Sequence, residues 1–448
     1  NDGWRDLYVL SWGKNRLFRN NGGEGFIDIT EQAGVAGDAN SKPASWGDFN
    51  QAGFVDLYVA NWSCSPRCGR PTTGDRDHLY QNNGDGTFTD VTNLLPSDKK
   101  FGAAFVASFT DYDNDGDLDI YLVKDEYIYP VGNGLWRNDG AGCDGWCFTE
   151  ISEEANADTQ LMGMGLATAD YDNDGDQDFY FSNAGPMTLL QNQGDGTFAD
   201  VAEAVGVQSR DQIGWGATFF DYDNDGWQDL YLAVSEAAAP GGSANNPLFR
   251  NDQTGGFENV SDSSGVNDGG ETLGVATADF DRDGRLDILI GNVDDGYHLY
   301  RNQSEAGSYF AIDLVGGGGV NRDAIGSRVR VTTADGQTRM QEVICGTSLG
   351  AGSELSLHFG LGDHEQISEL EIIWPDGLRQ SFSDVAGNQR VALAYPVDAE
   401  AEAAETKALY GEPRAGWITA GIIILGLALI GSLILFIAQG RLKSTAIS

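Results

Sequence analysis

The sequence predicts an all-β protein made of a β-propeller, a small all-β module and a single C-terminal transmembrane α-helix. Three observations carry this prediction. An Asp-rich pattern recurs through residues 1–315, and each copy is followed by an alternating apolar run. At about residue 316 the pattern gives way to a different set of alternating runs, up to residue 395. A long uncharged stretch then occupies residues 416–438.

The repeat is written in four complete copies of D-x-D-x-D-G-x-x-D, at 111–119, 170–178, 221–229 and 279–287. A degenerate copy lies at 48–56. The first six residues match the tail of the motif, with Asp2, Gly3 and Asp6 in register. We therefore expect the start of that first unit to lie upstream of residue 1.

Each unit carries the signals of about four strands. Small-residue runs such as GMGLATA precede the Asp-rich turn, and apolar runs such as IYLV follow it. Further along each unit, NG or DG steps separate two more apolar runs, and these residues tolerate the positive φ of tight hairpin turns. A four-stranded sheet repeated around an axis is a propeller blade.

The charge balance favours metal ions over nucleic acids as partners. The 448 residues include 68 Asp and Glu but only 27 Lys and Arg, for a formal net charge of −41. Phosphate backbones repel such a polyanion, so we expect no nucleic-acid partner. The 41% of hydrophobic residues also argues against disorder.

The Asp-rich turn has the spacing of a calcium loop. It places carboxylates at positions 1, 3, 5 and 9, a backbone carbonyl at 7 and Gly at 6, and Ca²⁺ prefers six to eight such oxygens. An EF-hand is excluded because position 12 lies in a predicted strand. The expected ligands are Asp111, Asp113, Asp115, Asp119, Asp170, Asp172, Asp174, Asp178, Asp221, Asp223, Asp225, Asp229, Asp279, Asp281, Asp283 and Asp287. The weaker candidates are Asp48, Asn50 and Asp56, where Ala52 replaces the third carboxylate, and the partial set Asp2 and Asp6.

The cysteines favour an oxidising compartment. Cys64 with Cys68 and Cys143 with Cys147 form two pairs at the same separation, which we interpret as local disulfides. Cys345 remains, and we expect a buried free thiol there.

The C-terminal region predicts a membrane anchor. Residues 416–438 carry no charge and are long enough to cross a hydrocarbon layer of about 30 Å. An acidic linker at 396–415 precedes the span, and the tail at 439–448 holds basic residues, so the tail is expected in the cytoplasm and the body outside, in the periplasm or on the cell surface. Such an exported body needs a signal peptide, which we expect to have been removed or not to be part of this chain. Three small residues share one face of the span and could contact another membrane helix: Gly421, Ala428 and Ser432.

Two resemblances extend this prediction. The Asp-rich turns resemble FG-GAP/VCBS (integrin-α-like) repeats, which implies a propeller of seven blades with calcium in the blade hairpins. Only six motifs are visible, so a seventh blade would draw on the upstream segment, and a six-bladed ring is the alternative. NRDAIGSRV, LHFGLG and WPDG in residues 316–395 resemble the ASPIC/UnbV domain of the cartilage-acidic-protein-like family.

These features predict a protein that binds partners rather than an enzyme. The four histidines lack metal-ligand spacing, and no nucleophile or nucleotide motif is present. We expect a membrane-anchored, extracytoplasmic, calcium-binding propeller for protein–protein interaction, either as an accessory subunit of a membrane complex or as an adhesion or recognition protein. The alternative is a carbohydrate-binding receptor that uses aromatic residues at the propeller rim: Trp12, Trp46, Trp62, Trp136 and Trp215.

Overall fold

The computed structural model describes residues 2–62, 75–126, 131–143, 145–209, 212–237, 245–293, 295–349 and 352–396. The predicted span at 416–438, with Gly421, Ala428 and Ser432, lies outside these ranges, as do the tail at 439–448 and the pair Cys64 and Cys68. Within the described ranges, no helix is both long and apolar enough to cross a membrane.

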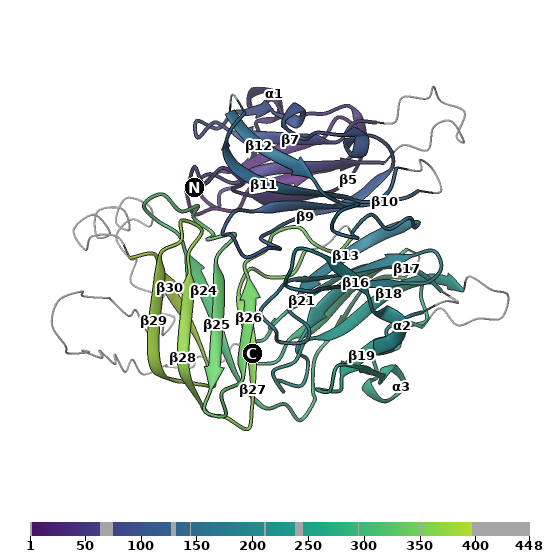
Figure 1. Cartoon of the computed structure of the whole chain (residues 1–448), viewed down its shortest axis with the longest axis vertical. Helices are drawn as coiled ribbons and strands as arrows, with labels where there is room; N and C mark the ends of the chain where they lie inside the picture. Colours follow the sequence, from purple (N-terminus) through teal and green to yellow (C-terminus); the bar gives the residue numbers. More distant parts are fainter. Residues whose placement is uncertain are drawn as a thin grey trace, which may run out of the picture.

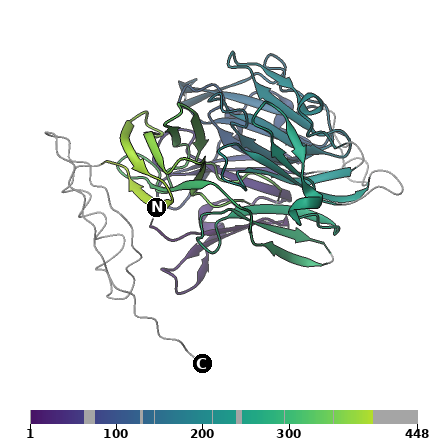
Figure 2. The same cartoon turned by 90° about the horizontal axis from the view of Figure 1, so that it is seen from below.

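Six small sheets follow one another around an axis in a propeller-like arrangement (Figures 1 and 2). The first three are β1 (Leu7–Val9), β3 (Arg16–Asn20) and β4 (Phe26–Asp28); β2 (Trp12–Gly13), β5 (Ala39–Gly47), β6 (Asp56–Asn61), β7 (His78–Asn82) and β8 (Phe88–Asp90); and β9 (Ala104–Thr110), β10 (Asp119–Lys124), β11 (Gly134–Gly142) and β12 (Gly145–Glu150). The others are β13 (Gly163–Ala169), β14 (Asp178–Asn183), β15 (Thr188–Asn192) and β16 (Phe198–Asp200); β17 (Gln212–Phe220), β18 (Asp229–Ala237), β19 (Leu248–Asn251) and β20 (Phe257–Asn259); and β21 (Thr272–Ala278), β22 (Asp287–Asn292) and β23 (Gly296–Tyr300).

The helical segments are short, and in the sequence they follow the last strand of one repeat sheet and precede a strand of the next sheet. They are α1 (Thr30–Ala33), α2 (Ala202–Val205), α3 (Ser261–Ser264) and the 3₁₀ turns η1 (Thr92–Leu94) and η2 (Asp98–Lys100). The predicted all-β class is therefore confirmed.

The core lies between neighbouring sheets. Every residue of β6, β10 and β14 is buried, because each of these strands has a neighbouring sheet on both faces. Tyr121 of β10 stacks on Phe179 of β14 with ring centroids 4.5 Å apart, which joins the third sheet to the fourth. This double burial explains why the runs after the Asp-rich turns are almost entirely apolar.

A repeated hydrogen bond also joins successive sheets. An Asn side chain in the third strand of one unit, or just after it in the case of Asn302, donates to the backbone carbonyl at position 2 of the Asp-rich loop in the preceding unit. The bonds run from Asn138 to Phe49 (2.8 Å), Asn192 to Tyr112 (2.8 Å), Asn251 to Tyr171 (2.9 Å) and Asn302 to Tyr222 (2.7 Å). In the first three cases, the position-2 ring also packs against an aromatic ring of the next sheet.

The first and sixth sheets present apolar faces to solvent. Apart from Trp12 of β2 and Leu378, the large apolar side chains exposed in the described ranges lie in these two units: Trp4, Leu7, Val9, Phe26, Ile27, Phe280, Leu289, Val293, Tyr297 and Leu299. Phe280 occupies position 2 of the last loop and is 72% exposed, whereas Tyr112 and Tyr171 at the same position are buried by the next sheet.

The C-terminal module has two sheets around its own core and lies beside the repeat sheets, on the left in Figure 1. One sheet contains β24 (Ser308–Val315), β27 (Leu357–Gly362) and β30 (Gln389–Ala394); the other contains β25 (Arg328–Thr333), β26 (Thr338–Glu342), β28 (Gln366–Ile373) and β29 (Arg379–Ala386). The module's first strand thus begins eight residues before the predicted boundary at 316. The alternation of residues 308–315 suits either sheet, and only pairing with β27 and β30 assigns it.

One predicted disulfide lies within the described ranges and is confirmed. Cys143 and Cys147 are bonded, with their Cα atoms 5.6 Å apart. Cys345 is a free cysteine, as predicted, but it is only partly buried.

Candidate metal centres

Each complete Asp-rich loop gathers carboxylates into one small volume. In every loop, three side chains offer oxygens that lie within 4.8 Å of one another. The sets are Asp111, Asp113 and Asp115; Asp170, Asp172 and Asp178; Asp221, Asp223 and Asp225; and Asp279, Asp281 and Asp287. The remaining predicted ligands, Asp119, Asp174, Asp229 and Asp283, lie in the same four loops or at their ends.

Backbone hydrogen bonds to position 1 shape each loop. Asp170 at position 1 accepts from the N–H groups of Asp174 and Gly175, each at 3.0 Å, and the other complete loops repeat these bonds. Position 4 has positive φ in every copy, for example 58° at Asn173, where Asn is one of the residues that tolerates it.

The position-9 carboxylate links the loop to its sheet. Asp178 accepts from the N–H of Tyr171 at 3.2 Å and from the N–H of Asn192 on β15 at 2.8 Å. Asp6 of the first unit accepts from Asn20 N–H at 2.7 Å in the same way. Position 9 is thus a structural acceptor as well as a candidate ligand, a double role that the spacing alone did not indicate.

The degenerate copy folds like the complete ones. Asp48 accepts from the N–H groups of Ala52 and Gly53 at 2.9 and 2.8 Å, and Asn50 also accepts from Ala52 N–H, at 3.2 Å. Asp56 occupies position 9 and accepts from Phe49 N–H at 3.1 Å. The loop conformation therefore does not need the third carboxylate. A metal ion in this loop would nevertheless have one carboxylate ligand fewer.

Burial and mutual repulsion make the carboxylates hard to ionise without a cation. Burial, followed by the charges of Asp174 and Asp172, raises the pKa of Asp170 to about 8. Burial likewise raises the pKa of Asp113 and of Asp223 to about 6, with neighbouring aspartates adding to the shift. A bound divalent cation would relieve both effects.

Three buried carboxylate oxygens without partners support a metal ion in the loops. Oδ1 of Asp113, of Asp172 and of Asp223 is buried and has no hydrogen-bond partner among the described residues. All three are at position 3, so the same atom lacks a partner in three loops. Buried polar atoms normally have partners, and a hard oxygen donor set suits Ca²⁺. The residues therefore fit a calcium ion.

Arginine side chains distinguish the first and fourth loops from the other two. Arg301 Nε lies 2.5 Å from Asp281 Oδ2, and Arg301 Nη2 lies 3.2 Å from Asp283 Oδ2. In the first loop, Arg328 Nη1 lies 3.3 Å from Asp111 Oδ2. No ion pair to the carboxylates of the second or third loop is found within the described ranges, so these two loops need a cation most.

We expect substitution of the second loop to remove one calcium ion per chain and substitution of the fourth loop to change calcium binding less. Asp172→Ala deletes a position-3 carboxylate that has one unpartnered oxygen, whereas Asp281→Ala deletes one that Arg301 already neutralises. Calcium per chain, measured by elemental analysis after gel filtration at low free calcium, compares the two variants. Equal losses in both would show that the arginine does not weaken the fourth loop.

The C-terminal module covers the loop end of the repeat sheets. Arg339 Nε donates to Gly226 O of the third complete loop at 3.2 Å. In the same loop, His358 Nε2 lies 2.9 Å from Asn224 Oδ1, and Gly362 N–H donates to Asn224 O at 2.8 Å. The sequence analysis missed this contact, because no local pattern marks these module residues as facing the loops.

A strap of the module enters the central channel between the sheets. We define the strap as the described residues 344–349 and 352–354. Trp46 N–H donates to Cys345 O at 3.0 Å, and Ser348 N–H donates to Leu166 O at 2.6 Å. At its far end, Thr277 N–H donates to Ser353 Oγ at 3.2 Å. The strap thus bonds to the second, fourth and sixth sheets.

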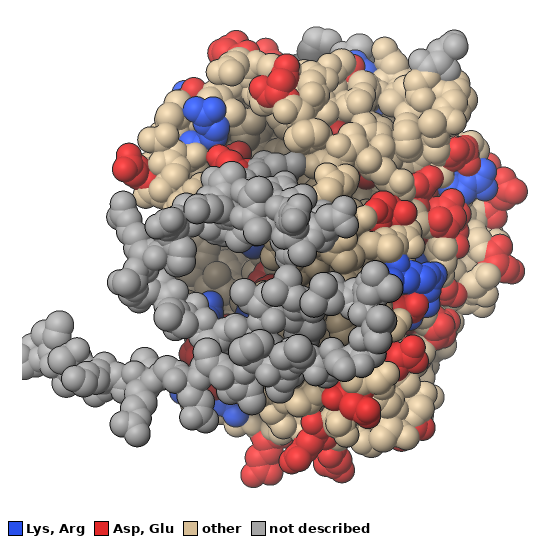
Figure 3. Space-filling model, turned by 90° about the vertical axis from the view of Figure 1, so that its left-hand side faces the viewer, with Lys and Arg blue, Asp and Glu red and all other residues tan. Residues whose placement is uncertain are grey.

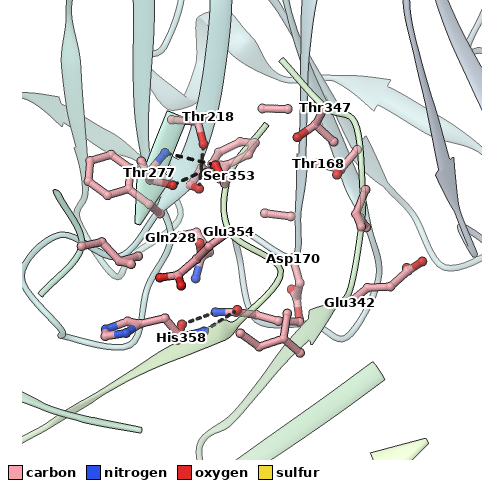
Figure 4. Close-up of a pocket in the computed structure, with 18 of the residues that line it drawn as sticks. Thr168, Asp170, Thr218, Gln228, Thr277, Glu342, Thr347, Ser353, Glu354 and His358 are labelled. Carbon is pink, nitrogen blue, oxygen red and sulfur yellow. Dashed lines mark hydrogen bonds between the residues drawn. The ribbon is translucent and has the colours of Figure 1, made fainter. Parts of the chain in front are cut away.

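A cavity of about 130 Å³ with a mixed polar and apolar lining lies beside the strap (Figure 4). Its hydroxyl groups come from Thr168, Thr218 and Thr277 of the inner strands and from Thr347 and Ser353 of the strap. The volume and the hydroxyl lining suit several ordered water molecules.

The aromatic residues of the carbohydrate-receptor alternative do not form one exposed row. Trp136 is fully buried, and its indole N–H donates to Pro96 O at 3.0 Å. Trp62 and Trp215 are partly buried and donate to Asp125 and Ser235. Only Trp12, at 69%, is largely exposed among these five. Their similar sequence positions reflect packing between sheets.

The buried His358 predicts that the folding stability of the protein depends on pH where the module contacts the third complete loop. It is buried, its ring stacks on Tyr309, and burial, followed by the charge of Arg390, lowers its pKa to about 4. The folded pKa lies below the value in an unfolded chain, so this stabilisation is complete above about pH 6.5 and is lost as the pH falls towards 4.

We therefore expect the free energy of unfolding of the His358→Gln protein to fall less between pH 7 and pH 5 than that of the wild type. The wild-type penalty at pH 5 is on the order of 2 kcal/mol, and the variant lacks it. Thermal melts of both proteins at pH 7 and pH 5 test this, because other acid effects are shared. An identical pH response of the two proteins would contradict it.

Comparisons with known proteins agree with this architecture. The FG-GAP-like repeat family matches residues 1–59, 66–122, 170–232 and 237–290, and the ASPIC and UnbV family matches residues 317–400. Cartilage acidic protein 1 of Mus musculus is 24% identical over 418 residues, covering 78% of this chain and 64% of the mouse protein. The Homo sapiens protein is also 24% identical, with coverages of 78% and 62%. The chain thus spans less than two thirds of the length of these relatives.

Solved structures are more distant. An Agrocybe aegerita lectin that recognises non-reducing terminal N-acetylglucosamine is 18% identical, with a TM-score of 0.41, and the match covers 68% of this chain and 75% of the lectin. The V. cholerae biofilm matrix protein Bap1 is 9% identical, with a TM-score of 0.32 and coverages of 85% and 62%. The FG-GAP-like matches alone span more than half of the sequence, so the chain belongs to the FG-GAP-like repeat family, and its residues 317–400 match the ASPIC and UnbV family.

Proposed function

We propose that this protein is a calcium-stabilised recognition module that binds another protein outside the cytoplasm and is anchored in the membrane by residues 416–438. The observation that carries the calcium part is the unpartnered position-3 oxygen in three of the loops. Calcium would supply the positive charge that these clustered carboxylates lack. With ligands drawn wholly from the protein, the loops suit a structural ion.

The surface and the predicted anchor support a binding role. Asp and Glu side chains are spread over the visible outer surface, among far fewer Lys and Arg (Figure 3). A rigid ring of sheets offers a broad face to a partner, and a membrane tether raises the effective concentration of any partner in the same membrane. An accessory subunit of a membrane complex and an adhesion or recognition protein both fit this description, and the partner's location distinguishes them.

Extraction of the full chain from native membranes tests the function. We expect mild detergent to release the protein together with an integral membrane protein in fixed stoichiometry, identified by mass spectrometry. A matched chain that ends at residue 396 retains the described domains and should lose membrane association. Recovery of the full chain alone, at every calcium concentration, would contradict the accessory-subunit role. Binding to glycans that Trp12→Ala abolishes would instead support the carbohydrate-receptor alternative.

We also propose that the ring has seven units and that the seventh packs between the first and sixth sheets. The exposed apolar side chains of these two units support this, because a larger exposed apolar surface usually marks a site that packs against another element. The repeat predicts what the seventh unit supplies: an Asn side chain for the Phe280 carbonyl and an aromatic ring against Phe280. A longer chain with the upstream sequence should bind less of an apolar dye than this chain. Equal dye binding would favour the six-bladed alternative.

A further inference from the structure

We propose that metal ions in the Asp-rich loops hold the C-terminal module on the repeat sheets and keep its strap inside the central channel. This inference rests on the calcium part of the proposed function and goes beyond it. The loops would then be a docking surface for the module, as well as stabilisers of their own sheets.

The module binds atoms whose positions the loops determine. Asn224 lies between two candidate ligands, Asp223 and Asp225, and has a φ of 56°. Its backbone carbonyl accepts from the module at Gly362, and its side-chain oxygen contacts His358. A change in the conformation of this loop therefore displaces both of these contacts with the module at once.

A buried charge cluster makes the same connection at the first loop. Arg328 of β25 is 5% exposed and donates to the backbone carbonyl of Asp111 and to the side chain of Asn114. Its Nε lies 3.6 Å from Glu342 Oε2, and the same Glu342 oxygen accepts from Thr110 Oγ1 at 3.1 Å. Arg328 therefore joins a charge pair inside the module to the backbone and side chains of the first loop.

The loops are also linked to one another, so a change in one reaches the next. Gln51 donates to Asp117 Oδ1 at 2.8 Å, Asn173 to Gly226 O at 3.2 Å, and Asn224 to Gly284 O at 2.9 Å. Each donor is the position-4 residue of its loop. Without a cation, the clustered carboxylates repel one another, so we expect the loops to change conformation. Because the loops are linked, this change would displace the loop atoms that contact the module in several units.

Cys345 offers a reporter for this docking. It lies in the strap, its carbonyl accepts from Trp46 N–H, and its side chain packs against the core of the module. Trp46 of β5 packs against the same core beside the strap, so departure of the module from the repeat sheets removes this ring and makes the thiol more accessible. The labelling rate of Cys345 with N-ethylmaleimide, followed by peptide mass spectrometry, therefore measures undocking directly.

The experiment compares the full chain in calcium and after chelation, at a temperature where far-UV circular dichroism shows intact sheets. We expect chelation to speed labelling of Cys345 by about tenfold or more, as for a local opening reaction. Arg328→Gln should speed labelling in the presence of calcium. The matched control is Arg379→Gln, which removes an exposed ion pair to Glu371 within the module and should leave the rate unchanged.

The outcomes separate this inference from the calcium proposal. If elemental analysis shows that calcium binds and is removed while the labelling rate stays constant, the docking inference is overturned and the calcium proposal stands. If faster labelling comes only with loss of the sheet signal, global unfolding explains it and the docking inference is also overturned. Absence of bound calcium would instead refute the proposed function on which the inference rests.

Discussion

Removal of calcium is expected to lower the melting temperature of this protein by about 10 °C or more. Each ion bound at a thousandfold excess over its dissociation constant contributes about 4 kcal/mol. The second and third loops alone would therefore contribute about 8 kcal/mol, and one kcal/mol shifts the midpoint of a large domain by roughly 1–3 °C. Differential scanning calorimetry with calcium and with EGTA measures the shift, and the Asp172→Ala protein should show a smaller one.

The loss of melting temperature on calcium removal should be larger at higher pH. The pKa of Asp170 rises from its usual value to about 8 in the metal-free fold. A carboxyl with a raised folded pKa stabilises the fold fully below the unfolded pKa, near 4, and this contribution is lost as the pH rises towards 8. The metal-free protein should therefore melt lower at pH 8 than at pH 6, while calcium binds more tightly to the ionised loops. A calcium-dependent shift that is smaller at pH 8 than at pH 6 would contradict this explanation.

Replacement of Gly165 by Ala is expected to destabilise the protein by about 3 kcal/mol or more, near the upper end of the range for overpacked interiors. Gly165 lies on β13, where the inner strands approach the axis. A Cβ atom there would lie 2.1 Å from Trp215 O and 3.1 Å from Gly216 Cα on β17. These are backbone atoms, so neither can move aside without shifting a whole strand.

Gly145→Ala is the matched control. Gly145 lies on β12, and a Cβ atom there has no neighbour within 4 Å. Its stability should stay within about 0.5 kcal/mol of the wild type, as for most surface substitutions. Urea or thermal denaturation of both variants measures the difference. A Gly165→Ala protein as stable as Gly145→Ala would show that the inner strands are packed more loosely than described.

Much of the repeat region could be predicted because its signals are local. The Asp-rich spacing predicted loops whose carboxylates do converge, since neighbouring residues in a tight turn are close in any fold. The pair Cys143 and Cys147 was predictable for the same reason. The alternating runs predicted strands on both sides of each loop. Calcium itself stays a prediction, supported by the chemistry of the oxygens.

Other features could not be predicted because they depend on residues far apart in the sequence. Arg328 reaches the first loop from more than 200 positions away, and Arg301 reaches the fourth loop only because the β22–β23 hairpin folds back on it. Nothing near either arginine in the sequence indicates these contacts. Trp136 was expected to be exposed at the propeller rim in the carbohydrate-receptor alternative, but it is buried. The sequence could not show this, because burial depends on which sheet packs against a strand face.

The sequence by itself determined the all-β class, the repeated loop, the change of pattern after the repeats and the local disulfide. Each of these follows from residues within one turn or one strand, where chain connectivity already brings the atoms together. Only the tertiary structure decided that residues 308–315 belong to the module, that the module covers the loops and that its strap enters the channel. Those outcomes depend on which surfaces meet after folding, which local patterns do not encode.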